Sequence, residues 1–118
     1  MELRVEVANA AGLLARINAA VSLGKMPGWW RAGDRLITTV DGIDVVFETR
    51  VDVLAAHPPH PPMQLLICRA TGAQEAAKLS DAITRLEVAI RNRFVTPRPE
   101  AEPIDDHGVV NAEFVIRE

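Results

Sequence analysis

The sequence predicts one α+β domain, and three local patterns support this fold class. Residues 2–7 alternate strictly between polar and apolar side chains, which is the period of a half-buried strand. Residues 13–21 place apolar side chains at helical spacing, and residues 79–94 do the same over several turns. The Asp41-Gly42 dipeptide joins two β-rich segments, and it suits a two-residue hairpin turn whose central residues need positive φ angles. Strands, helices and a hairpin therefore alternate within 118 residues.

The first half of the chain is expected to contain the first helix and the hairpin. Asn9 is a suitable N-cap for that helix, and Gly24 is a suitable terminator. Residues 27–33 predict a loop because of their proline and glycine content. Strands are expected over residues 35–40 and 43–47, one on each side of the turn.

The second half begins with a short helix and a buried strand. Residues 51–56 favour one or two helical turns, which the proline-rich run at 57–62 ends. Residues 64–69 form an apolar run typical of a buried strand. Thr71 and Gln74 have the spacing of a capping box, so a long helix is expected to begin just after Thr71.

The C-terminal part is expected to add a connector and a last strand. Residues 96–103 are rich in proline and acidic side chains, and residues 109–116 predict a strand with one apolar face: Val110, Ala112, Phe114 and Ile116. We therefore divide the chain into an α+β domain over residues 1–95 and a connector with its strand over residues 96–118. The sequence leaves open whether this strand closes its own sheet edge or pairs with another chain.

Composition and charge limit the classes of function. A hydrophobic fraction of 48% is typical of a globular protein, and a net charge of -3 argues against nucleic acid or an anionic membrane as the main partner. No apolar run approaches the roughly 20 residues that span a bilayer, and no signal stretch opens the chain, so a cytoplasmic protein is expected. The single cysteine, Cys68, lies in an apolar run and is expected to be a buried structural thiol.

No catalytic or metal-binding motif is recognisable. His57 and His60 lie among prolines, and a polyproline helix separates residues at this spacing by about 9 Å, which is too far for one metal ion. His107 follows two aspartates in a segment typical of a turn, which is an unspecific cation site. Phosphate loops, dinucleotide fingerprints, paired-cysteine zinc motifs and serine elbows are absent from the sequence. We therefore expect that the protein is not an enzyme and that it binds no cofactor and no metal ion.

Residues 7–16 read Val-Ala-Asn-Ala-Ala-Gly-Leu-Leu-Ala-Arg. This segment resembles the phosphorylation loop of the histidine-containing phosphocarrier (HPr) family, where Asn or Asp and two spacers precede Gly-Leu-His-Ala-Arg. Leu14 stands at the position of the histidine, and Ile17 stands where a proline usually follows the arginine. The expected element order over roughly residues 3–91 also resembles the family. The resemblance implies an HPr-like open-faced β-sandwich, an antiparallel sheet with helices on one face, plus the extra C-terminal strand.

The resemblance also implies a protein without phosphocarrier activity. Leucine has no lone pair, so Leu14 cannot accept the phosphoryl group that the family's histidine holds at a helix N-terminus. Family members dock through the first helix and the short second helix, which implies a partner surface that includes Leu14 and Arg16. Thr49 lies near the serine that some members use as a regulatory phosphorylation site. The alternatives are a core position for Leu14, a solvated charge or a relic anion site for Arg16, and an ordinary strand residue for Thr49.

Two adjacent tryptophans, Trp29 and Trp30, form a second candidate surface. The chain has only these two tryptophans, three phenylalanines and no tyrosine. Tryptophan is enriched at interface hot spots, whereas the alternative places one indole in the edge of the core.

The predicted function is a non-catalytic, HPr-like protein-binding or regulatory module whose partner is another protein. Its candidate partner-binding residues are Leu14, Arg16, Trp29 and Trp30, and Thr49 is its candidate phosphorylation site. The alternative is a small accessory subunit of an enzyme complex, or a homo-oligomer assembled through the C-terminal strand.

Overall fold

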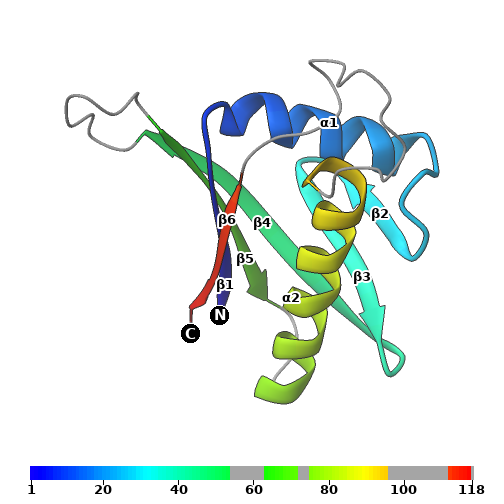
Figure 1. Cartoon of the computed structure of the whole chain (residues 1–118). Helices are drawn as coiled ribbons and strands as arrows, with labels where there is room; N and C mark the ends of the chain where they lie inside the picture. The colour runs from blue at the N-terminus through cyan, green and yellow to red at the C-terminus, as the bar shows by residue number, and fades with distance from the viewer. Residues whose placement is uncertain (54–62, 72–74, 96–111, 118) are drawn as a thin grey trace.

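The computed structural model contains one antiparallel sheet of six strands and two helices, which confirms the α+β class (Figure 1). The structure describes residues 1–53, 63–71, 75–95 and 112–117. The strands are β1 (Glu2–Val7), β2 (Trp29–Ala32), β3 (Arg35–Val40), β4 (Ile43–Val53), β5 (Gln64–Thr71) and β6 (Glu113–Arg117). The helices are α1 (Ala10–Ser22) and α2 (Ala76–Ile90), and one π-helical turn, η1 (Arg91–Val95), continues α2. Across the sheet the strand order is β2-β3-β4-β5-β1-β6.

Both helices pack on the same face of the sheet. Every second residue of β1 is buried there, beginning with Leu3, because side chains alternate between the two faces of a strand. The predicted apolar positions of the long helix, Ile83, Leu86 and Ile90, are fully buried against this face. Phe47 of β4 is the largest of the fully buried side chains. No helix within the described ranges is long and apolar enough to cross a membrane.

The predicted first helix and hairpin are confirmed. Asn9 caps α1, because its Oδ1 accepts a hydrogen bond from the Gly12 backbone N–H at 2.9 Å. The β3–β4 turn has φ angles of 50° at Asp41 and 78° at Gly42, as a type I′ hairpin turn requires.

The predicted loop over residues 27–33 is wrong in its centre, where Trp29–Ala32 form the edge strand β2. Its four residues pair with β3, so that Trp29 lies opposite Thr38. The Thr38 hydroxyl also donates to the Gly28 carbonyl at 2.9 Å. Pairing with a neighbouring strand therefore overrides the loop composition.

The short helix predicted over residues 51–56 is wrong where the structure describes it. Val51, Asp52 and Val53 continue β4 and pair with β5 as far as Gln64, and residues 54–56 lie outside the described residues. The interstrand ladder therefore extends β4 well beyond the predicted end at Phe47.

The predicted helix cap at Thr71 is also wrong. Thr71 is the last residue of β5, and its hydroxyl donates to the Val46 carbonyl at 3.1 Å. Helix α2 begins at Ala76 after Glu75, and Gln74 lies outside the described residues.

The C-terminal strand joins the chain's own sheet, which answers the question that the sequence left open. β6 covers Glu113–Arg117 and pairs antiparallel with β1. Of the predicted apolar face, Ala112 and Phe114 pack against the core, whereas Ile116 is 43% exposed and Val110 lies outside the described residues. Residues 109–111 and the predicted connector at 96–103 lie outside the described residues.

Candidate functional site

The face of the sheet that points away from the two helices, which we call the open face, is free of any helix in the part of the chain that the structure describes. On β1 this face carries Glu2, Arg4 and Glu6, while Leu3, Val5 and Val7 point into the core. Residues that pair across neighbouring strands share a face, so the strand register assigns the other side chains of the open face.

Two neighbouring rows of side chains cross the open face with opposite charges. The basic row runs over β4, β5, β1 and β6 and consists of Arg50, Ile67, Arg4 and Val115. The acidic row crosses the same strands in the same order and consists of Asp52, Leu65, Glu6 and Glu113. The two rows are two residues apart along each strand, which is about 7 Å. Both rows have an apolar residue on the central strand β5.

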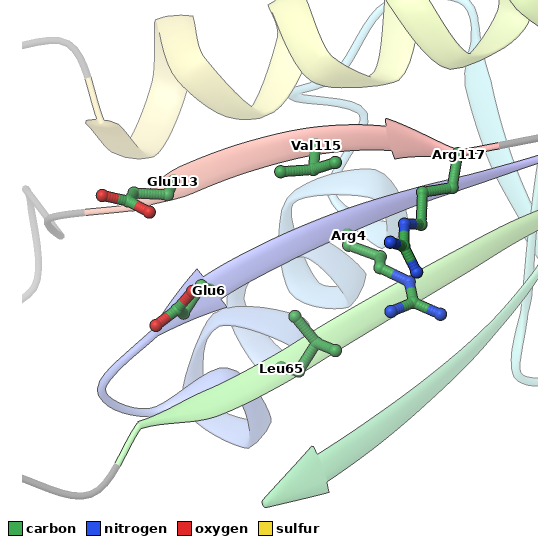
Figure 2. Close-up of a pocket in the computed structure, with 6 residues that line it drawn as sticks. All are labelled: Arg4, Glu6, Leu65, Glu113, Val115 and Arg117. Atoms are coloured by element: carbon green, nitrogen blue, oxygen red, sulfur yellow. The ribbon is translucent and has the colours of Figure 1, made fainter. Parts of the chain in front are cut away.

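A hollow of about 270 Å³ lies where these rows cross β5, β1 and β6. Figure 2 shows the guanidinium groups of Arg4 and Arg117 at one end of the hollow, and the carboxylates of Glu6 and Glu113 at the other. Leu65 and Val115 complete its lining. The hollow therefore has a basic end, an apolar middle and an acidic end.

The charges at the acidic end are only partly balanced. Glu6 and Glu113 are direct partners across β1 and β6, and like charges in that position destabilise a sheet. Among the described residues neither carboxylate forms an ion pair, whereas Arg4 is paired with Glu2 at 2.8 Å. This arrangement favours a ligand that places a positive charge above Glu6 and Glu113.

The N-terminus of α1, where the resemblance located a phosphate site, is occupied by the chain's own side chains. The Ala10 N–H donates to Gln64 Oε1 at 2.8 Å, and the Ala11 N–H reaches the same oxygen at 3.4 Å. The third donor, Gly12 N–H, is bound by Asn9. Because the donors of the first turn are satisfied, the end of this helix offers an anion no free N–H group among these three.

The four predicted partner-binding residues do not gather at one place. Leu14 is half-buried on α1 and packs against the core, and Arg16 on the same helix is half-buried. Trp29 is buried, with its ring centroid 5.6 Å from that of Phe47. Trp30 is 40% exposed and lies opposite Ile37, on the open face. Of the four, only Trp30 therefore belongs to the open face.

Thr49 lies within β4 rather than at the start of a helix. It is opposite Cys68 on β5, and its hydroxyl donates to the Asp34 carbonyl at 3.5 Å. The short helix expected over residues 51–56 is absent from residues 51–53, so a phosphate at Thr49 would lie within a strand and not beside a helix N-terminus in the described part of β4.

The single thiol is placed for packing. Cys68 is fully buried, and desolvation raises the pKa of its thiol to about 12, so it is protonated and unreactive at neutral pH. The described residues contain no group of three or more His, Cys, Asp or Glu side chains that could hold a metal ion. His57, His60 and His107 lie outside these residues.

The residues around the hollow were not identified from the sequence. One signal was present, since the polar positions of residues 2–6 alternate in charge as Glu, Arg, Glu, and these side chains must share one face of β1. That Leu65, Val115 and Arg117 lie beside these side chains follows from the strand register, which the sequence does not specify.

Comparison of the chain with protein-family models, with curated proteins and with solved structures finds no match.

Proposed function

We propose that this chain is a non-catalytic, protein-binding module on an HPr-like scaffold, without phosphocarrier activity, and that the open face is its binding surface. The observation that carries this proposal is the pair of oppositely charged rows around an apolar centre, on a face that no described helix covers. Charged rows around a central apolar strip are suited to recognising a protein surface, because charges give specificity and apolar burial gives affinity.

Two observations support the proposed absence of catalytic activity. Leu14 replaces the histidine of the resemblance, and Gln64 and Asn9 occupy the backbone donors that would hold a phosphoryl group. The only cysteine is buried and protonated at neutral pH. The proposal takes the partner to be a cytoplasmic protein rather than nucleic acid or a membrane, in keeping with the net charge of -3.

The test is co-purification of partners with the tagged chain from its native host, using two folded variants. The open-face variant, Glu113→Arg with Val115→Arg, changes two exposed side chains of β6. The helix variant, Ala15→Glu with Ala19→Glu, changes two exposed positions of α1 beside Leu14 and Arg16. We expect the open-face variant to lose a partner that the wild type and the helix variant both retain. Loss from the helix variant alone would instead assign the partner to α1, as the resemblance implies.

A second candidate function is an accessory subunit or a homo-oligomer assembled through the C-terminal strand. The observation that favours it is the position of β6 at the edge of the sheet, where Val115 and Ile116 are 51% and 43% exposed. Self-association that is lost on removing residues 104–118, but is insensitive to charge changes on β4, would support this function.

A further inference from the structure

We propose that the open face binds a second copy of this chain in a two-fold symmetric dimer, with the two-fold axis midway between the basic row and the acidic row. The inference rests on the proposed function, because it takes the open face as the binding surface and names the partner. It follows from the order of charges within the two rows.

The axis lies in the interface and runs parallel to the rows, that is, across the strands. A two-fold rotation about it reverses the direction of every strand in the partner and leaves the order of the strands along the axis unchanged. Each strand then faces the same strand of the partner, and the basic row of one copy lies over the acidic row of the other. Such a contact is isologous, so each pair of facing residues occurs twice.

The facing residues complement each other on the three strands β4, β5 and β1. Arg50 faces the partner's Asp52, and Arg4 faces the partner's Glu6. Between these ion pairs, Ile67 faces the partner's Leu65. Ile67 is only 3% exposed in its own chain, so the accessible apolar surface at this point belongs mainly to Leu65. Four interchain ion pairs therefore flank the two Leu65 side chains, and on β6 Val115 faces the partner's Glu113 without a complementary charge.

The same arrangement reduces the charge imbalance in the hollow, because Glu6 gains a facing arginine, while Glu113 faces the partner's Val115. It brings the partner's Arg4 over the acidic end, where Glu6 and Glu113 face each other without an ion pair among the described residues. It also brings the partner's Glu6 over the basic end, which Arg4 and Arg117 form (Figure 2). Two packed sheets lie about 10 Å apart, a separation that side chains from both faces fill.

The position of the axis is specific. The next row along the strands contains Glu48, Arg69, Glu2 and Arg117. An axis shifted by one row would place Arg69 over Ile67 and Arg117 over Val115. The shifted axis would keep two facing pairs of opposite charge, Arg50 with Glu48 and Arg4 with Glu2. It would bury two arginines of each copy against apolar side chains, whereas the proposed axis buries one charged side chain of each copy, Glu113 against Val115. The desolvation cost is therefore smaller for the axis between the basic and acidic rows, which is favoured.

The experiment measures the dimer dissociation constant of the purified full-length chain by sedimentation equilibrium, from micromolar to submillimolar concentration. The two test variants are Arg50→Glu and Asp52→Arg. Both side chains are exposed, at 66% and 46%, and their only ion pair in the described structure is with each other at 3.4 Å, so both variants are expected to fold. Each variant alone places like charges opposite each other at two symmetric positions, and we expect it to weaken the dimer by about tenfold or more.

Mixing the two variants is the decisive measurement. In a mixed dimer Glu at position 50 faces Arg at position 52, and Asp52 faces Arg50, so every facing pair is again of opposite sign. We expect the mixture to dimerise about as tightly as the wild type, within a factor of about three. An edge-to-edge pairing of β6 gives no such recovery.

The control is Glu48→Arg, which reverses a 56% exposed charge on the same strand and face but one row outside the contact. It should leave the dissociation constant unchanged within about threefold. A wild-type chain that stays monomeric, a mixture that does not recover, or a Glu48→Arg variant as weak as Arg50→Glu would each overturn the dimer. If the chain is monomeric and its open-face variant still loses another protein in the co-purification, the proposed function stands and only this inference fails.

Discussion

The guanidinium group of Arg91 lies over the ring of Phe114, 4.1 Å from its centroid, and so connects the end of α2 to the C-terminal strand. Arg91 is held in place by Glu87, one helical turn earlier, whose carboxylate it contacts at 3.3 Å. Phe114 also packs against the core from β6. Since β6 has only β1 as a neighbour in the sheet, this contact is a second attachment for a strand that carries part of the open face.

We expect Arg91→Ala to loosen β6 without unfolding the domain. A cation–π contact at a partly exposed site stabilises by about 0.5–1 kcal/mol, so amide exchange within β6 should become about two- to fivefold faster. The measurement is native-state hydrogen exchange of the Glu113–Arg117 amides. Arg93→Ala is the matched control, because Arg93 lies on the same turn but over Phe94, 6.0 Å from its centroid. Equal acceleration by both variants would contradict the role of the Arg91–Phe114 contact.

The two adjacent tryptophans should differ sharply in their contribution to stability. Trp29→Ala leaves a cavity against Phe47 and should reduce the free energy of unfolding by about 3–5 kcal/mol. Trp30→Ala removes a side chain that is 40% exposed and should cost less than about 1 kcal/mol. Urea denaturation of both variants measures the difference. Similar losses for the two would mean that Trp29 is not the core residue of the pair.

The cap of α1 depends on a glycine three residues later. A Cβ atom at Gly12 would lie 2.5 Å from Nδ2 of Asn9, so an alanine there displaces the capping side chain. We expect Asn9→Ala to cost about 1 kcal/mol. Gly12→Ala should cost no more than that, because it loses the same cap and gains helix propensity. The double variant should be no less stable than Asn9→Ala alone, and a fully additive loss in thermal unfolding would disprove the coupling.

Burial of Cys68 makes stability fall at high pH. Desolvation raises the pKa of this thiol from 9.0 to about 12 in the folded chain, so the folded state retains a proton that the unfolded state releases. The stabilisation from the protonated thiol is therefore complete below pH 9.0 and is lost as the pH rises towards about 12, at about 1.4 kcal/mol per pH unit.

The measurement for Cys68 is the free energy of unfolding of the wild type and of Cys68→Ala between neutral pH and pH 11. The stability difference between them should be constant below pH 9.0 and should shift against the wild type above it. Below pH 9.0, a disulfide reagent should react with the thiol only after the chain has unfolded. Rapid labelling of the folded chain at neutral pH would contradict the buried, protonated thiol.

Sequence reasoning predicted the elements whose causes are local. The Asn9 cap, the Asp41-Gly42 turn and the apolar face of α2 each depend on residues within a few positions of one another. The alternation in β1 also predicted which of its side chains are buried. These features were readable because their spacing along the chain is the spacing of the interaction itself.

The elements that were mispredicted depend on pairing between distant segments. Residues 29–32 have a loop composition, yet they form β2 because β3 offers them a ladder of hydrogen bonds. Residues 51–53 extend β4 because β5 continues beside them. Propensity is a weak signal compared with such tertiary pairing.

The sequence by itself determined that this chain is an α+β domain with a capped first helix, a tight hairpin, a buried thiol and no histidine at position 14. Only the tertiary structure decided which residues form its surfaces. Gln64 caps α1 from 54 residues away, and Glu6 and Glu113 come together from opposite ends of the chain. The physical reason is that a residue's face follows from local alternation, whereas its neighbours on that face follow from strand register, which is set by the packing of the whole sheet.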